Sequence, residues 1–119
     1  MIRALFFLSI AFLAAPLQAQ EVSSAPAAIL RGLDKLDGSV TDIKLAVGKN
    51  QNFGRLNITL EDCRYPKGNP AGNAFAFLTI RENGKDDPVF QGWMIAAAPA
   101  LDALDNARYD VWVLRCITE

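Results

Sequence analysis

The sequence predicts a small all-β domain, either an antiparallel β-sandwich or a partly open β-barrel, with one short helical turn and one disulfide. Short segments in which apolar and polar side chains alternate recur along the chain, as in half-buried strands. Clusters of Gly, Asn, Asp and Pro separate them roughly every 8–12 residues, a spacing typical of sandwiches and small barrels. The chain also holds two cysteines, enough for one covalent link between strands.

The first segment, residues 1–19, has the pattern of a secretory signal peptide. Arg3 precedes an unbroken apolar run from Ala4 to Ala15, and the segment ends at the small residue Ala19. The run is too short to cross a hydrocarbon layer of about 30 Å as a helix. We therefore expect cleavage after Ala19, export, and no membrane insertion once the signal peptide has been removed.

The rest of the chain divides into a leader and one domain. Residues 20–28 are small and polar and include Pro26, so we expect a flexible leader without structure of its own. Residues 29–119 are long enough for one small core and are predicted to form a single β domain.

The first pair of strands is predicted to be a hairpin. Residues 29–36 and 40–47 flank Asp37-Gly38, and Asp-Gly favours a type I′ turn because both of its central residues need a positive φ. In the second arm Ile43 and Leu45 share one face. The first arm also suits a helical turn, so the sequence leaves its conformation open.

Four further strands follow. The clearest covers residues 53–63 and places Leu56, Ile58 and Leu60 inward; Cys63 does not follow this alternation, which predicts a bulge or the strand end near Asp62. The remaining elements are a loop at 64–73, a central strand at 74–82, a turn at 83–88, a strand at 89–97, a helical turn at 99–104 that starts with Pro99, and a last strand at 108–117.

The last strand suggests how the cysteines are used. Strand alternation puts Trp112, Leu114 and Cys116 on one side, so we favour a core position for Trp112. An exported protein with only Cys63 and Cys116 is expected to form a disulfide between them. Because redox-active pairs usually stand in a Cys-x-x-Cys motif, this bond is predicted to be structural.

Composition excludes several classes of function. The full chain carries 12 Lys and Arg against 13 Asp and Glu, and the basic residues stand singly, which argues against nucleic-acid binding. Histidine is absent, so Ser-His-Asp and Cys-His mechanisms lack their base, and a catalytic zinc site would have a poor ligand set. We predict no cofactor and no metal.

One part of the sequence suggests a recognition surface. Trp and Tyr supply large, rigid contact areas, and the candidate binding surface comprises Trp93, Met94, Tyr109 and Asp110. Trp93 suits a surface and a core position equally well. If Asp110 faces the interior, it needs a partner, and both Arg108 and a backbone amide at the end of the helical turn are candidates. A structural ion pair is favoured over a role as a catalytic acid.

Several motifs together resemble the DUF2155 family of small exported proteins of Gram-negative bacteria. They are Leu30-Arg31-Gly32-Leu33-Asp34-Lys35-Leu36-Asp37-Gly38, Val47-Gly48, Phe53-Gly54-Arg55-Leu56, Gly92-Trp93-Met94, Pro99-Ala100-Leu101, and Tyr109-Asp110-Val111-Trp112 with Cys116. The resemblance implies a periplasmic location, supports the paired cysteines and carries over no catalytic residue. Family members tend to have Ser where Ala97 and Ala98 stand, and often His-Pro at the position of residues 106–108. These departures favour a packing role over catalysis.

We therefore expect a non-catalytic accessory or binding module of the cell envelope whose partner is another envelope protein. One alternative is a small hydrolase or lyase that uses Asp110 together with Asp62 or Asp34. Another is an inhibitor of an exported enzyme that presents the 64–73 loop. The sequence does not predict the oligomeric state.

Overall fold

The computed structural model describes residues 21–119, so the predicted signal peptide lies outside the described residues. The described part of the chain forms eight strands. They are β1 (Val22–Ser24), β2 (Ala27–Asp34), β3 (Ser39–Ala46), β4 (Asn50–Phe53), β5 (Leu56–Pro66), β6 (Phe75–Glu82), β7 (Pro88–Ile95) and β8 (Tyr109–Ile117).

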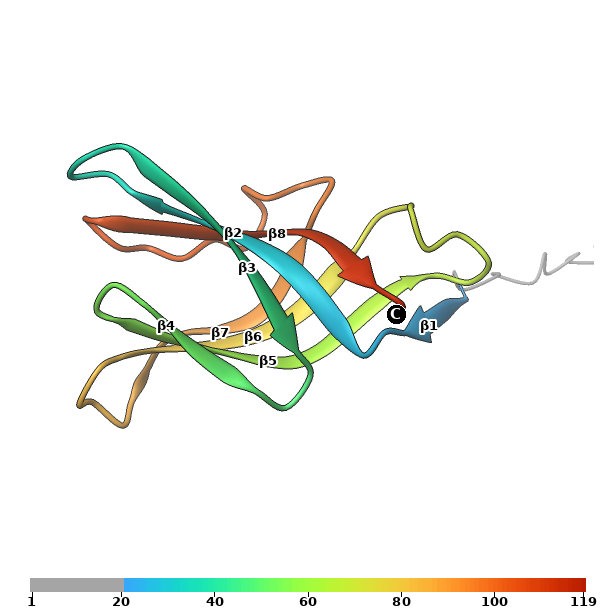
Figure 1. Cartoon of the computed structure of the whole chain (residues 1–119), viewed down its shortest axis with the longest axis horizontal. Helices are drawn as coiled ribbons and strands as arrows, with labels where there is room; N and C mark the ends of the chain where they lie inside the picture. Colours follow the sequence, from blue (N-terminus) through green and yellow to red (C-terminus); the bar gives the residue numbers. More distant parts are fainter. Residues whose placement is uncertain (1–20) are drawn as a thin grey trace, which may run out of the picture.

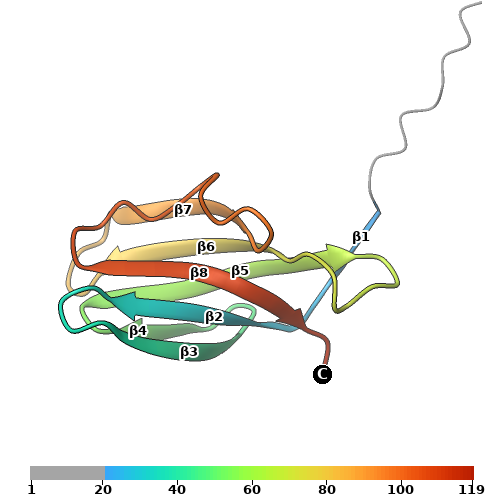
Figure 2. The same cartoon turned by 90° about the horizontal axis from the view of Figure 1, so that it is seen from above.

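The strands form two antiparallel sheets that pack face to face (Figures 1 and 2). The five-stranded sheet has the order β1-β5-β6-β7, and β4 also pairs with β5. The three-stranded sheet has the order β3-β2-β8. The all-β prediction is confirmed, and the architecture is an open sandwich rather than a closed barrel.

The predicted hairpin is formed by β2 and β3, and its first arm is a strand throughout. Its turn differs from the type I′ turn that Asp37-Gly38 suggested. Asp34 pairs with Ser39, which leaves four residues in the loop, and in this loop only Gly38 has a positive φ. A carboxylate oxygen of Asp34 accepts a hydrogen bond from the amide of Leu36, so side chains help to hold the longer turn.

The predicted strand at residues 53–63 contains a turn at its start and extends further at its end. β4 ends at Phe53, which pairs with Leu56, so Gly54 and Arg55 form a two-residue hairpin turn. Gly54 has a φ of 57° and Arg55 has no positive φ, a combination typical of a type II′ turn. The bulge predicted from Cys63 is confirmed, because the pairing of β5 with β6 shifts between Leu60 and Asp62.

The core lies between the two sheets and is made of inward-facing aliphatic side chains. The central strands β5 and β6 contribute Leu56, Ile58, Leu60, Leu78 and Ile80, and the other sheet contributes Leu30, Ile43, Val111 and Val113, all at most 2% exposed. Burying one such side chain stabilises the fold by about 1.5–3 kcal/mol. The central position predicted for the 74–82 strand is confirmed, because β6 lies between β5 and β7.

Two predictions about irregular segments are wrong. Within the expected flexible leader, Val22–Ser24 pairs with the end of β5, and the amide of Ala25 donates a hydrogen bond to the carbonyl of Cys63 over 2.7 Å. Backbone pairing orders this segment, and its sequence shows no alternation of apolar and polar side chains that would predict a strand. The expected helical turn at 99–104 is a series of turns, in which the amide of Leu101 donates to the carbonyl of Ala98, and the segment buries Leu104 instead of winding into a helix.

Candidate functional site

Apolar side chains gather on the outer face of the five-stranded sheet, where no other element of the described chain covers them. On β6 the inward residues are Ala76, Leu78 and Ile80, so Phe75 and Phe77 point outward. Their partners on β7 are Ile95 and Trp93. We call the following residues the aromatic patch: Val22, Phe75, Phe77, Trp93 and Ile95.

Trp93 is fixed in this patch by an aromatic ring and a cation. Its indole meets the ring of Phe77 edge to face, with centroids 5.2 Å apart. The guanidinium of Arg64 lies 5.0 Å from the centroid of the indole. Arg64 in turn donates a hydrogen bond from Nε to the Asp62 carboxylate over 2.8 Å. The indole is therefore held in one orientation, and the cation above it is already paired.

A shallow hollow opens in the patch. Its volume is about 270 Å³, and its lining residues are Val22, Arg64, Phe75 and Trp93. Small-molecule sites usually enclose roughly 300–1,000 Å³ and bury most of the ligand. The hollow is open and its volume falls just below this range, so it suits a single apolar side chain of a partner better than a whole ligand.

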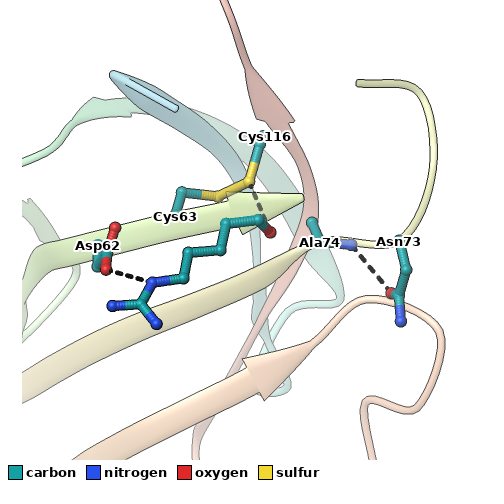
Figure 3. Close-up of a disulfide and its surroundings, with 6 residues drawn as sticks. Asp62, Cys63, Asn73, Ala74 and Cys116 are labelled. Atoms are coloured by element: carbon teal, nitrogen blue, oxygen red, sulfur yellow. Dashed lines mark hydrogen bonds and ion pairs between the residues drawn. A yellow bond between two sulfur atoms is a disulfide. The ribbon is translucent and has the colours of Figure 1, made fainter. Parts of the chain in front are cut away.

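The disulfide lies beside this site and anchors its backbone. Cys63 of β5 is bonded to Cys116 of β8, so the bond joins the two sheets, as predicted (Figure 3). Arg64 follows Cys63 directly, and its carbonyl oxygen lies 3.4 Å from the sulfur of Cys116. The side-chain oxygen of Asn73 accepts hydrogen bonds from the amides of Ala74 and Ala97, which ties the 67–74 loop to the end of β7. The disulfide and the hydrogen bonds of Asn73 therefore hold the backbone in place at both ends of the aromatic patch.

The four residues of the predicted binding surface do not form one surface. Trp93 lies in the aromatic patch, but Met94 is 2% exposed and Tyr109 is 4% exposed, so both belong to the core. Asp110 is on the outer face of the other sheet. The reason is strand geometry: Trp93 and Met94, and likewise Tyr109 and Asp110, are consecutive residues of a strand and point to opposite faces.

The core position favoured for Trp112 is also wrong. Val111 and Val113 point inward, whereas Trp112 is half-buried on the outer face. The side chain lines a hollow of about 360 Å³ together with Asp110 and the segment at 99–103. The expectation failed because of a bulge: Leu30 pairs with Val113, but Ile29 pairs with Arg115, which shifts the alternation before Cys116.

The predicted ion pair of Arg108 with Asp110 is replaced by one with Asp34. The guanidinium of Arg108 donates two hydrogen bonds to the Asp34 carboxylate, at 3.1 and 3.0 Å. These bonds lower the pKa of Asp34 and raise the pKa of Arg108. The pair connects the turn after β2 to the start of β8.

We expect this ion pair to make folding depend on pH. Because the pKa of Asp34 is lower in the folded chain than its ordinary value of 3.8, the pair contributes stability above about pH 4 and loses it as the pH falls through the folded pKa. Urea unfolding of Asp34→Asn should therefore show a smaller decrease in stability between about pH 5 and pH 2 than wild type. Arg108→Gln should flatten the profile in the same way. Unchanged profiles in both variants would contradict this assignment.

The structure does not bring together the carboxylates of the hydrolase alternative. Asp34 is paired with Arg108 at the turn end of the three-stranded sheet. Asp62 is paired with Arg64 on the outer face of the five-stranded sheet, and Asp110 lies on the outer face of the opposite sheet. The alternative requires Asp110 and one of the other two carboxylates to act on one substrate, so this arrangement does not support it.

A hollow of about 810 Å³ lies at the turn end of the sandwich and is lined mainly by polar and charged residues. Two of its cations are paired: Lys85 contacts Glu82 at 2.9 Å, and Arg108 contacts Asp34. Among residues 21–119, no cluster of three or more His, Cys, Asp or Glu side chains is placed to hold a metal ion. Nor does this part of the chain contain a helix long and apolar enough to span a membrane.

Sequence reasoning missed Phe75, Phe77 and Arg64 as parts of the site. The available signal was the segment 74–78, which is apolar on both faces although only one face of a sandwich strand meets the core. The outward residues of such a segment are candidates for a binding surface.

Comparison with known proteins gives one match. The profile of a family described as "Uncharacterized protein conserved in bacteria (DUF2155)" matches residues 28–116, a range that includes Trp93 and both cysteines. No curated protein and no solved structure gives a significant match.

Proposed function

The chain belongs to the DUF2155 family, and we propose that it is a non-catalytic binding module of the bacterial cell envelope that binds another envelope protein through the aromatic patch. The observation that carries this proposal is the outward-facing Trp93, held between Phe77 and Arg64 on an otherwise uncovered sheet face. Apolar surface exposed in this way is typical of protein–protein contact sites.

The composition of the patch supports a protein partner. Trp and Arg are, with Tyr, the residues most enriched among binding hot spots. Trp contributes a large rigid ring, and Arg contributes several hydrogen-bond donors. The patch also has a polar rim, since Gln91 donates a hydrogen bond to Thr79, which in turn donates to Glu61. An apolar centre with a hydrogen-bonded rim is the usual anatomy of an interface.

A periplasmic location fits this proposal. The signal-peptide pattern of residues 1–19 would direct export. The Cys63–Cys116 disulfide is compatible with an oxidising compartment. We therefore place the partner among the proteins of the same compartment.

In-cell crosslinking identifies the partner. A photoreactive residue at Phe75 places the probe in the patch, and the same residue at Lys44, exposed on the outer face of the other sheet, is the matched control. One envelope protein captured from position 75 and not from position 44 is the expected result. Equal capture from both positions would contradict a binding site in the patch.

Trp93→Ala is expected to weaken binding to that partner at least tenfold, roughly 1.4 kcal/mol, while the domain remains folded. Trp112→Ala is the matched control, because Trp112 is also half-buried but lies on the outer face of the opposite sheet. Affinities of purified proteins, measured by calorimetry, and thermal unfolding check both variants. Equal affinities for the two variants, or loss of folding in Trp93→Ala alone, would contradict the proposal.

A projecting loop supports an inhibitor as a second candidate function. The loop between β5 and β6 extends beyond the end of the sandwich (Figures 1 and 2), and it carries internal hydrogen bonds from Asn69 to Pro66 and from Gly72 to Asn69. A loop ordered in advance loses little entropy when it enters an active site. Replacement of residues 67–72 by Gly and Ser would abolish such inhibition, whereas Trp93→Ala would not.

A further inference from the structure

Three connecting segments meet at the turn end of the sandwich and border the hollow of about 810 Å³ (Figures 1 and 2). They are the hairpin turn between β4 and β5, the turn between β6 and β7, and the segment that leads into β8. The volume lies within the range of roughly 300–1,000 Å³ that is typical of small-molecule sites. Because the lining is mainly polar and charged, a ligand of this hollow must itself be polar.

Hydrogen bonds fix these three segments relative to one another. The amide of Asn83 donates to the carbonyl of Arg55 over 2.8 Å, which joins the two turns. The amide of Arg55 donates to the hydroxyl of Tyr109, which joins the first turn to the start of β8. The side-chain oxygen of Asn106 accepts hydrogen bonds from the amides of Arg108 and Tyr109, at 2.9 Å each. The hollow is therefore formed in advance, and a ligand that enters it loses little free energy to the ordering of loops.

Two charged side chains beside the hollow are not paired. The cations of Lys85 and Arg108 are already held by carboxylates, as described above. Arg55 and Asp105 also line the hollow and are exposed, and neither takes part in an ion pair within residues 21–119. One unpaired cation and one unpaired anion therefore border the same preformed space.

These two charges define the chemistry of a matching ligand. The planar guanidinium of Arg55 can donate two parallel hydrogen bonds to a carboxylate. The carboxylate of Asp105 suits an ammonium group, which has three donors and no acceptor. Amino acids and short peptides carry both groups, with a polar backbone between them.

We propose that the hollow binds a small zwitterion, an amino acid or a short peptide, whose carboxylate pairs with Arg55 and whose ammonium group pairs with Asp105. No residue of the aromatic patch lines this hollow. The proposal therefore goes beyond the proposed function and does not rest on it.

The test is a titration of the purified exported protein followed by nuclear magnetic resonance. Alanine, dialanine and trialanine are the probes, because they carry the same two charges at increasing separation. At least one of them is expected to shift the amide signals around residues 55, 83 and 106, with a dissociation constant of about 1 mM or lower. The proposal is overturned if none of the three shifts these signals at about 10 mM, or if the shifts lie elsewhere.

Single charges of the probe and of the protein are then removed in matched pairs. Amidation of the C-terminus of the best probe and Arg55→Gln should each raise the dissociation constant at least tenfold. The two changes together should have no more effect than either alone, because both remove the same ion pair. Acetylation of the N-terminus of the probe and Asp105→Asn should behave in the same way. The modified probes test these contacts in wild type as well, should a variant not fold.

Lys44→Gln is the matched control, because it removes a positive charge from an exposed position on the outer face of the other sheet. It should leave the dissociation constant unchanged. Arg55→Gln should remain folded, since Arg55 holds its turn through the backbone amide and carbonyl. A folded Arg55→Gln variant that binds the probe like wild type would overturn the proposal. Binding that depends on Arg55 but not on Asp105 would also overturn it, because the site would then be one for simple anions.

Discussion

Replacement of both Cys63 and Cys116 by alanine is expected to lower the free energy of unfolding by about 4 kcal/mol. The bond closes a loop with a sequence separation of 53, and removing it restores the entropy of that loop to the unfolded chain. It is also the covalent link between the two sheets. Small domains have a total stability of only about 5–15 kcal/mol, so the loss is a large fraction of the whole.

Denaturant unfolding of the double variant and of wild type, each with and without a reducing agent, tests this expectation. The reducing agent should bring wild type close to the double variant and leave the variant unchanged. A difference below about 1 kcal/mol between the oxidised wild type and the variant would contradict the expected role. It would mean that residual structure in the unfolded chain keeps residues 63 and 116 close together even without the bond.

The second large effect is expected for Gly54→Ala, with a loss of about 2–4 kcal/mol. Gly54 has a φ of 57°, a conformation that other residues adopt only with strain. A Cβ at this position would also contact the hydroxyl of Tyr109 and lie 2.6 Å from its Cζ. Tyr109 would have to move, although its ring packs against Phe53 with centroids 5.4 Å apart and its hydroxyl accepts a hydrogen bond from the amide of Arg55.

Gly38→Ala is the matched control for this prediction. Gly38 has a φ of 75°, but a Cβ there would meet no atom within 4 Å. We therefore expect only the backbone strain of about 1–2 kcal/mol, as measured by urea unfolding. Tyr109→Phe in the Gly54→Ala background should recover part of the difference, because it removes the nearest atom. Equal losses at Gly54 and Gly38 would show that Tyr109 adjusts freely.

Most of the fold could be predicted from the alternation of apolar residues. Ile43 and Leu45 point inward as expected, and the mismatch at Cys63 located a bulge that the structure contains. The same reasoning failed for Trp112, because the second bulge, opposite Ile29, leaves no mark in the sequence. An extra residue in a strand can be seen only when the residues on both sides of it have an obvious preference for one face.

The candidate site was harder to predict than the fold. Trp93 was recognised because of its residue type, but its neighbours in space, Phe77 and Arg64, are brought to it by strand pairing rather than by sequence proximity. Val22 belongs to β1, whose position depends on backbone bonds to β5. A single sequence does not encode the register of such pairings in a readable form, since many registers preserve the same alternation.

The position of the disulfide determines how the domain responds to mechanical tension. β1 pairs with β5 next to Cys63, and Ala28 pairs with Cys116. β1 and the C-terminus lie at the same end of the sandwich (Figure 1), and tension between the two ends of the chain is therefore transmitted through this bond. Of the chain between Ser24 and Cys116, only about 40 residues can then be drawn out, roughly 140 Å at about 3.5 Å per residue. Reduction would release the 53-residue separation as well and extend the same chain to roughly 320 Å. Under tension, the oxidised chain can therefore be extended to less than half the length that the reduced chain reaches.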